Sequence, residues 1–340
     1  MKALVFRGIR DLRYEVVPTP ECAATEARVQ VRAVGICGSD VHGYLGTTGR
    51  RVPPMIMGHE FTGIVESIGS EVRGVHAGDP VAVFPYVPCG QCPYCHDGRI
   101  NACQDKRFFG VFSINGGMAE YVSVPADALV PLPEGAGFVH GALGEPLSVA
   151  ARTVGKAEIA PAASLIIIGA GSIGLLSLIL AKVRGATAIG VVDICEDRLD
   201  LARSLGAEWT LNPRTQKPAD VLPASLRVRG ADTVIEAVGV DATVNQAVQL
   251  VARGGKIVIV GMLEKRIAVD MHELVSKEIR LEASFLYDRE EFQHILGQLE
   301  SLKPQLSRIV SHAVPLSEGV DYFVRLAAGE RNICKVVLTN

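Results

Sequence analysis

A strand, a glycine-rich turn, a helix and a second strand constrain the fold of this chain more than any other stretch. Ser164–Ile168 is a continuous apolar run, typical of a parallel strand that is buried on both faces. It leads into Gly169-Ala-Gly171-Ser-Ile-Gly174 and a helical pattern, and the next strand, Ile189–Val192, ends at Asp193. A lone Gly-x-Gly-x-x-Gly is weak evidence, but here the strand, the helix and the acidic residue complete the dinucleotide-binding fingerprint. The stretch therefore predicts a doubly wound α/β domain that binds a dinucleotide.

The alternation of helix and strand continues beyond this fingerprint. Further elements are expected at Cys195–Gly206 (helix), Asp232–Val238 (strand), Asp241–Ala252 (helix), Lys256–Val260 (strand) and Ile279–Phe285 (strand). Amphipathic helices are then expected at Asp288–Ser301 and Ser317–Ala328, followed by a strand at Ile333–Thr339. This order is typical of a parallel sheet with crossover helices.

The first 130 residues have a different texture. Short alternating runs broken by glycine and proline predict strands at Ala27–Ala33, Gly63–Ile68, Pro80–Phe84 and Ala119–Val124. We expect a small, irregular β domain here. A chain of 340 residues exceeds what one core comfortably supports, so two domains are the default.

Composition narrows the class of partner. Lys and Arg number 34 against 37 Asp and Glu, a net charge of -3, which provides no electrostatic footprint for nucleic acid or an anionic membrane. No apolar run reaches the roughly 18 residues of a membrane span, and the amino-terminal run meets charge too soon for a signal peptide. Eight cysteines are too sparse for a disulfide scaffold. We therefore expect a cytoplasmic protein that acts on a small molecule.

The strongest single motif is Cys89-Gly-Gln-Cys92-Pro-Tyr-Cys95, followed by Cys103. Four thiolates so close together suit a closed, tetrahedral structural zinc, which ties down a loop that lacks a core of its own. An iron–sulfur cluster is the other metal that this spacing permits, and unpaired reduced thiols are the alternative without a metal.

A second set of candidate ligands begins with Cys37-Gly38-Ser39-Asp40-Val41-His42 and continues at Gly58-His59-Glu60. A thiolate, an imidazole and a carboxylate are ligand types that zinc favours, and catalytic zinc keeps one position open. A lone Cys is more often a small buried hydrophobic residue, but a hydroxyl and an imidazole beside Cys37 form a path for an alcohol proton. The remaining ligand is sought in Glu60 or in Glu145, within Gly144-Glu145-Pro146.

These motifs, with Glu145-Pro146-Leu147-Ser148, resemble those of the zinc-dependent medium-chain dehydrogenases of the alcohol dehydrogenase superfamily, in the sorbitol or polyol dehydrogenase branch. The resemblance implies a chaperonin-10-like, β-rich catalytic domain of residues 1–146 and 285–340. A Rossmann domain for NAD, residues 147–284, is inserted into it. It also implies one catalytic and one structural zinc per chain, and a homo-oligomer, either a dimer or a tetramer.

The resemblance also implies which residues act. Cys37, His59, Glu60 and Glu145 would surround the catalytic zinc, with the order of the two glutamates left open. The proton would pass through Ser39 and the cofactor ribose to His42 and solvent. The cofactor contacts would be Gly169, Gly171, Ile173, Gly174, Asp193, Arg198, Val260, Gly261, Met262, Phe285 and Tyr287. Asp193 favours NAD over NADP because a carboxylate pairs with ribose hydroxyls and repels a 2′-phosphate. Arg198 could lie over the adenine, as the resemblance implies, or partly neutralise such a phosphate.

The expected reaction is oxidation of a secondary alcohol of a polyol to the ketose, with hydride transfer to nicotinamide, which we expect to lie near Cys37 and His59. Where sorbitol dehydrogenases carry Phe-Arg-Tyr, this chain has Phe285-Leu286-Tyr287, which puts sorbitol itself in doubt. Alternatives are a sugar-acid 5-dehydrogenase of the L-idonate or L-galactonate type and L-threonine 3-dehydrogenase. A quinone reductase-like or regulatory relative would lack the metal ligands. Aromatic residues that could shape the pocket are Tyr44, Phe108, Phe109 and Phe112.

Overall fold

The computed structural model describes residues 1–160 and 162–340. The chain divides into two units, each with its own sheet system. Unit 1 is Met1–Glu145 with Asp288–Asn340, and unit 2 is Pro146–Tyr287. The boundary falls within α4 (Gly144–Ala157) and again at the turn after Tyr287.

Unit 2 contains a six-stranded parallel sheet with the strand order β13-β12-β11-β14-β15-β16. Its strands are β11 (Ser164–Ile168), β12 (Ala188–Val192), β13 (Trp209–Leu211), β14 (Ala231–Glu236), β15 (Val251–Ile259) and β16 (Arg280–Ala283). Every residue of β11 is buried, as its apolar run predicts. The strand order of the sheet reverses between β11 and β14, so the expected doubly wound α/β fold is confirmed.

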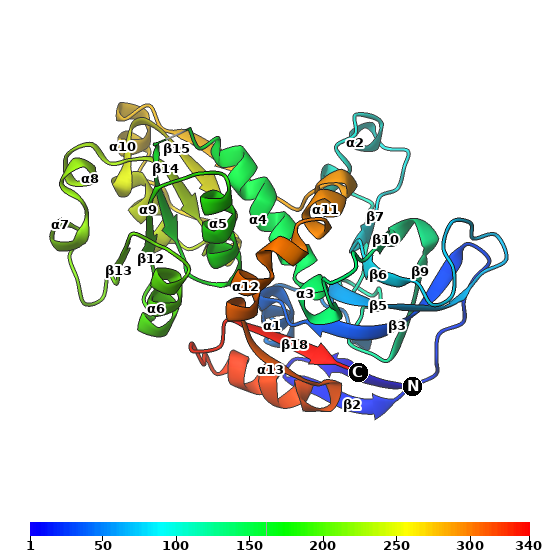
Figure 1. Cartoon of the computed structure of the whole chain (residues 1–340). Coiled ribbons are helices and arrows are strands. Elements are labelled where there is room, and N and C mark those ends of the chain that lie inside the picture. The colour runs from blue at the N-terminus through cyan, green and yellow to red at the C-terminus, as the bar shows by residue number, and fades with distance from the viewer. Residues whose placement is uncertain (161) are drawn as a thin grey trace. The chain divides into compact units, whose positions relative to one another are not determined.

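Helices alternate with the strands of this sheet along the chain of unit 2 (Figure 1). They are α5 (Ser172–Val183), α6 (Glu196–Ser204), α7 (Pro218–Val221), α8 (Ala224–Arg229), α9 (Asp241–Leu250) and α10 (Met271–Ser276). The first helix approaches the glycine-rich turn closely, because a Cβ on Gly174 would lie 1.8 Å from the Gly169 carbonyl oxygen. Only glycine permits this approach, which aims the amino end of α5 at the turn.

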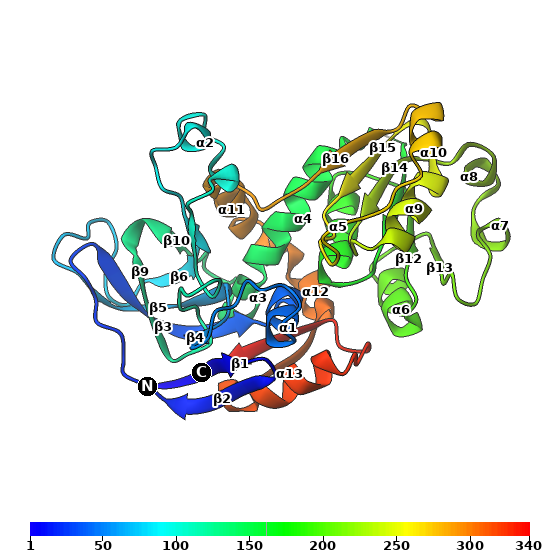
Figure 2. The ribbon, with the colours of Figure 1, turned by 180° about the vertical axis from the view of Figure 1, so that it is seen from behind.

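Unit 1 is built around a seven-stranded, mainly antiparallel sheet in which strands from both ends of the chain meet (Figures 1 and 2). Strand β3 (Glu26–Gly35) pairs with β5 (Glu60–Ile68), β9 (Tyr121–Pro125) and β18 (Lys335–Thr339). The sheet is completed by β6 (Pro80–Val83), β10 (Leu129–Pro131) and β17 (Val310–Pro315). Smaller sheets contain β1 (Lys2–Gly8), β2 (Asp11–Val16), β4 (Met55–Ile56), β7 (Tyr86–Val87) and β8 (Arg107–Phe108).

The helices of unit 1 differ from the sequence prediction in one place. Besides α1 (Gly38–Tyr44), α2 (Pro93–His96), α3 (Phe138–Ala142) and α13 (Gly319–Ala327), the carboxy-terminal segment contains two helices, α11 (Arg289–Leu296) and α12 (Leu299–Ile309). The single helix expected at Asp288–Ser301 is therefore wrong. The break falls at Gly297-Gln298, and the second helix continues through Pro304, which periodicity alone would not allow.

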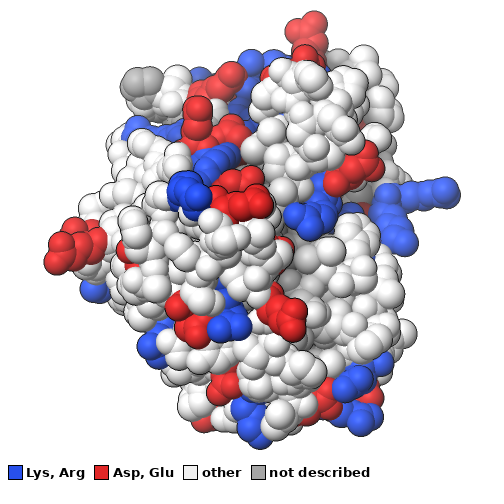
Figure 3. All heavy atoms as spheres, turned by 90° about the vertical axis from the view of Figure 1, so that its right-hand side faces the viewer, with Lys and Arg blue, Asp and Glu red and all other residues white. Residues whose placement is uncertain are grey.

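The surface carries no strong single-sign field on the face shown in Figure 3, where acidic and basic side chains alternate among uncharged atoms. Within residues 1–160 and 162–340, each helix is too short or too polar to cross a lipid bilayer.

Candidate metal centres and dinucleotide site

The first cluster in unit 1 joins a thiol, an imidazole and a carboxylate. The candidate ligand atoms of Cys37, His59 and Glu60 all lie within 4.8 Å of one another. Cys37 caps the amino end of α1, directly after β3, whereas His59 precedes β5 and Glu60 is its first residue. Because β3 and β5 pair with Gly35 opposite Glu60, the sheet register brings these two chain segments together.

Asp40 lies behind the candidate ligands and contacts the residues that carry them. Its Oδ2 accepts a hydrogen bond from the Cys37 backbone N–H at 3.2 Å, and its Oδ1 accepts one from Arg51 Nη2 at 2.7 Å. The same Oδ1 faces His59 Nδ1 at 3.7 Å, so the other ring nitrogen is the one available to a metal. A carboxylate behind a histidine ligand orients the ring and raises its basicity.

Glu60 pairs with a buried lysine. Lys335 Nζ, at the start of β18, donates to Glu60 Oε1 at 2.8 Å and to Oε2 at 2.7 Å, and also contacts the Ile36 carbonyl oxygen at 3.2 Å. Burial alone would lower the pKa of Lys335, but the charges of Glu60 and Cys37 outweigh it and raise the pKa. Lys335 therefore stays charged and compensates one of the carboxylates at the cluster.

Glu145 lies in the same electrostatic environment, although its carboxylate is not part of the 4.8 Å cluster. Burial is the main cause that raises its pKa to about 8, with contributions from the charges of Glu60 and Cys37. Burial and Glu60 likewise raise the pKa of the Cys37 thiol to about 11. Acidic groups thus outnumber basic ones at the cluster, and a divalent cation is the kind of ligand that would favour their ionised forms. The donor set fits zinc.

The proposed proton path starts on α1. Ser39 and His42 lie three residues apart, on one side of this helix. Ser39 Oγ accepts a hydrogen bond from Arg51 Nη2 at 3.2 Å, and His42 is half-buried, which lowers the pKa of its imidazole. A neutral imidazole near a hydroxyl can accept a proton at physiological pH.

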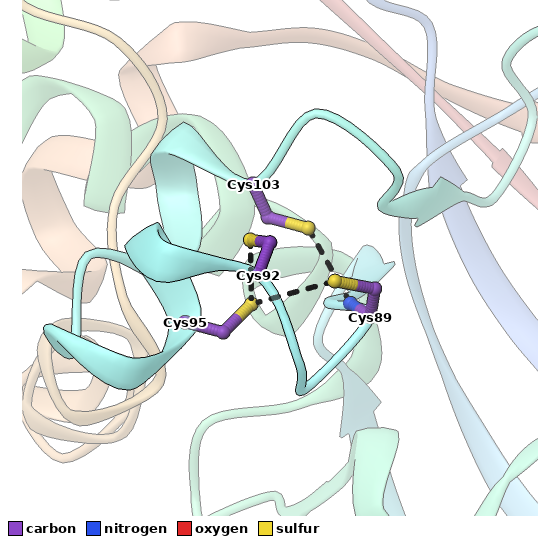
Figure 4. Close-up of side chains that lie close together, drawn as sticks. All are labelled: Cys89, Cys92, Cys95 and Cys103. Atoms are coloured by element: carbon purple, nitrogen blue, oxygen red, sulfur yellow. Dashed lines mark hydrogen bonds between the residues drawn. The ribbon is translucent and has the colours of Figure 1, made fainter.

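The four cysteines of the second cluster converge in the loop that carries α2 (Figure 4). Their sulfur atoms lie within 4.8 Å of one another, with Cys92 Sγ 3.5 Å from Cys95 Sγ and Cys89 Sγ 3.9 Å from Cys95 Sγ. Disulfide sulfurs would be about 2.05 Å apart. Sulfurs around a tetrahedral zinc, at about 2.3 Å from the metal, would be about 3.8 Å apart. The spacing fits the closed metal site.

Backbone hydrogen bonds prepare one of these sulfurs for ionisation. N–H groups of Gln91 and Cys92 lower the pKa of the Cys89 thiol to about 7. Loss of hydration and the neighbouring Cys92 raise the pKa of Cys95 to about 12. Four thiols without a cation therefore resist full ionisation, which a bound metal would reverse.

In unit 2, the acidic end of the fingerprint is held in place by the glycine-rich turn. Asp193 directly follows β12, and its two oxygens accept hydrogen bonds from the backbone N–H groups of Ala170, at 2.7 Å, and Cys195, at 2.9 Å. The carboxylate thus lies at the carboxyl end of β12, next to the turn at Gly169–Gly171, as a dinucleotide site requires.

The remaining predicted cofactor residues lie in the first turns of helices α5 and α6 or in the segments after strands β15 and β16. Gly171 caps α5, Ile173 is half-buried in its first turn, and Arg198 is half-buried in α6. The N–H groups of Val260 and Gly261 donate to the Glu236 carbonyl oxygen at the end of β14. Met262 and Phe285 are exposed, whereas Tyr287 is buried. Their contacts with a cofactor remain predictions.

Comparison with known proteins assigns the chain to a family. The model of the alcohol dehydrogenase GroES-like domain matches residues 23–134, and that of the zinc-binding dehydrogenase domain matches residues 172–301. Sorbitol dehydrogenase from Bacillus subtilis is 34% identical over 291 residues, covering 84% of this chain and 82% of that protein. The chain belongs to the zinc-dependent alcohol dehydrogenase superfamily. The predicted family is therefore confirmed, and the chain is an oxidoreductase.

Other relatives span several substrates. L-idonate 5-dehydrogenase from Vitis vinifera is 32% identical over 318 residues, covering 92% of this dehydrogenase and 87% of the relative. Among solved structures, galactitol-1-phosphate dehydrogenase from Escherichia coli has a TM-score of 0.92 and 29% identity, with both chains fully covered. A zinc-binding dehydrogenase from Sinorhizobium meliloti, bound to NADP, has a TM-score of 0.92 and 32% identity, covering 100% of this chain and 99% of that one.

The aromatic residues expected near the pocket of this dehydrogenase fall into separate places. The Phe108 ring contacts the His59 ring edge-on, with centroids 5.6 Å apart. Tyr44 is buried and packs edge-on against Phe323, and Phe109 is also part of the core. Phe112 is exposed. Phe108 is therefore the candidate that lies beside a predicted metal ligand.

Sequence reasoning missed Arg51 and Lys335 and assigned no role to Asp40. The lysine directly precedes three apolar residues of its strand, which was a usable signal for a buried ion pair. Arg51 lies in a loop rich in glycine and proline and had no such signal.

Proposed function

We propose that this dehydrogenase uses zinc and NAD to oxidise a secondary alcohol of a polyol, or of a related sugar acid, to the ketone. The observation that carries the proposal is the cluster of Cys37, His59 and Glu60, with Glu145 buried in the same electrostatic environment. The names of the relatives support the substrate class.

When bound, zinc supplies Lewis acidity that makes an alcohol hydroxyl easier to deprotonate. Cys37 and His59 would hold it, with Asp40 Oδ1 facing the other ring nitrogen of the histidine at 3.7 Å. The hydroxyl proton would pass to Ser39 Oγ as Ser39 releases its own proton, by way of the cofactor ribose, toward His42 and solvent. When bound, NAD would supply the acceptor for the hydride of the carbinol carbon, so one oxidised alcohol would yield one ketone, one reduced cofactor and one proton.

Selectivity for several hydroxyls follows from the carboxylates. Any alcohol can be activated by the metal, so discrimination must come from groups that pair with neighbouring hydroxyls. Glu60, which also pairs with Lys335, and Glu145 are the buried carboxylates of this site, and a site that accepts hydrogen bonds from substrate hydroxyls discriminates against an alcohol that lacks them. We expect a vicinal diol to be oxidised far better than a simple primary alcohol.

The test is an initial-rate screen of polyols, aldonates, threonine and primary alcohols with NAD. We expect the highest kcat/KM for a polyol or aldonate, at least about 100-fold above 1-butanol, because sites built to pair a hydroxyl discriminate by up to about 10⁴–10⁵. Efficient oxidation of ethanol or 1-butanol, with no activity on any polyol or sugar acid, would refute the proposal.

A sugar-acid 5-dehydrogenase is the second candidate. Leu286 stands where sorbitol dehydrogenases carry an arginine, and L-idonate 5-dehydrogenase is among the relatives. We expect weaker use of sorbitol than of a polyol or aldonate with a different hydroxyl configuration. In the same screen, a kcat/KM for an aldonate that exceeds that of every polyol would favour this candidate.

NAD rather than NADP is the expected cofactor. The Asp193 carboxylate is fixed by two backbone N–H groups and would face a 2′-phosphate with like charge. Initial rates should favour NAD by at least about tenfold, the size of a modest electrostatic preference of about 1.4 kcal/mol. Asp193→Ser should reduce the ratio of the rate with NAD to the rate with NADP. Asp197→Ser, at an exposed acidic position in α6, is the matched control and should leave this ratio unchanged. A preference of the unmodified chain for NADP would overturn the assignment.

The predicted cytoplasmic location and homo-oligomeric state are part of this proposal. Eight free cysteines, among them the four of the closed cluster, are compatible with a reducing compartment. Size-exclusion chromatography with light scattering would distinguish a monomer from the expected dimer or tetramer.

A further inference from the structure

Arg51 is a buried cation that the proposed mechanism has not used. Its side chain is 2% exposed, and one nitrogen, Nη2, makes two contacts: with Asp40 Oδ1 at 2.7 Å and with Ser39 Oγ at 3.2 Å. The first contact compensates a fully buried carboxylate. The second reaches the hydroxyl at which the proposed proton path begins.

The fold makes room for this side chain. A Cβ on Gly43, in α1, would lie 2.3 Å from Arg51 Cγ, so the aliphatic part of the arginine passes where any other residue would block it. The backbone on both sides of Arg51 is also fixed, because Phe112 accepts from the Val52 N–H and donates to the Arg50 carbonyl oxygen. A long side chain held this way presents its donor in one place.

The hydrogen bond between Arg51 and Ser39 can have only one direction, with the guanidinium as donor and the hydroxyl as acceptor. A guanidinium has donors and no acceptor, whereas a hydroxyl has one donor and two acceptor positions. Once Ser39 Oγ accepts from Arg51, one acceptor position and its own proton remain. These are what a relay needs: the oxygen accepts the proton of the substrate and passes its own onward.

Asp40 makes the contact with Arg51 necessary. The carboxylate and the Ser39 hydroxyl accept from the same nitrogen, so they are neighbours, and an uncompensated carboxylate would attract the hydroxyl proton. We propose that Arg51 is a positioning residue that keeps the Ser39 hydroxyl directed toward the reacting alcohol rather than toward Asp40. This inference rests on the proposed oxidation of an alcohol.

The test is a double-mutant cycle on the full chain with the best alcohol of the screen. Arg51→Lys keeps a positive charge near Asp40 but is shorter and should withdraw from Ser39, whereas Arg51→Met removes the charge as well. We expect each to lower kcat at least about tenfold, within the range of general acid–base contributions, with KM changed less than about threefold. In a Ser39→Ala background, the same replacements should have little further effect on kcat.

Two controls separate positioning from general damage. Lys256→Met removes a buried cation of unit 2, which pairs with Glu158 and Glu282. It should lower the melting temperature, but any change in kcat should be the same in the Ser39 and Ser39→Ala backgrounds. Zinc per chain should stay constant in Arg51→Lys. Equal losses in both Ser39 backgrounds, or a loss of kcat that follows loss of zinc, would overturn the inference.

A readout independent of turnover distinguishes this inference from the proposed function. In crystal structures, Ser39 Oγ should accept from Arg51 in the unmodified chain and turn toward Asp40 in Arg51→Met, which leaves that carboxylate without the compensating charge. An unchanged Ser39 rotamer would refute the positioning role even if polyols are oxidised. Conversely, the rotamer change would stand if the screen identified another alcohol as the substrate.

Discussion

Cys37→Ser is expected to lower kcat by about a thousandfold or more while the chain stays folded. A thiolate is the only sulfur ligand of the predicted catalytic set, and loss of the metal's several kcal/mol of charge stabilisation corresponds to at least three powers of ten. The fold should survive because Cys37 caps α1, and serine is a favoured residue at that position.

Elemental analysis, circular dichroism and thermal unfolding check this expectation together with kcat. The variant should lose one of two zinc ions per chain and change its melting temperature little. Cys22→Ser, at a half-exposed cysteine away from both clusters, is the matched control and should leave both zinc ions and kcat unchanged. Undiminished turnover in Cys37→Ser would exclude a catalytic role for this sulfur.

The parts of the site that lie close together in sequence could be predicted without a structure. The four clustered cysteines span fifteen residues, and the glycine-rich turn with Asp193 spans a single βαβ unit, so local spacing carries the information. The doubly wound sheet followed from the buried run at Ser164–Ile168 and the alternation after it.

The contacts that support these residues could not be predicted in the same way. Lys335 reaches Glu60 across 275 positions of the chain, through the pairing of β18 with β3. Arg51 reaches Ser39 because Gly43 leaves space, which is a property of packing and not of pattern. The break at Gly297 was missed because both helices continue a similar amphipathic period. Tertiary context decided each of these cases.

Cys92→Ser should primarily reduce stability. Neither α2 nor the short helix η1 (Ile100–Ala102) contains a buried residue, so this loop lacks an apolar core, and the four sulfurs are what can hold it together. Loss of a metal site belongs to the largest class of substitution effects, about 4 kcal/mol. At about 2–4 °C per kcal/mol for domains of 150–250 residues, the melting temperature of unit 1 should fall by about 10 °C.

The measurements for Cys92→Ser are zinc and iron per chain, the melting temperature, and limited proteolysis between residues 88 and 106. We expect one zinc ion fewer, faster cleavage in this loop, and a kcat at low temperature within about tenfold of the unmodified chain, since the loop closes a structural site. His96→Ser, in the same loop but outside the sulfur cluster, should retain both zinc ions. Iron in the unmodified protein would replace the zinc assignment by an iron–sulfur cluster. An unchanged melting temperature with abolished turnover would reverse the roles of the two sites, because a closed set of ligands stabilises the folded chain, whereas a set with an open position acts on a substrate.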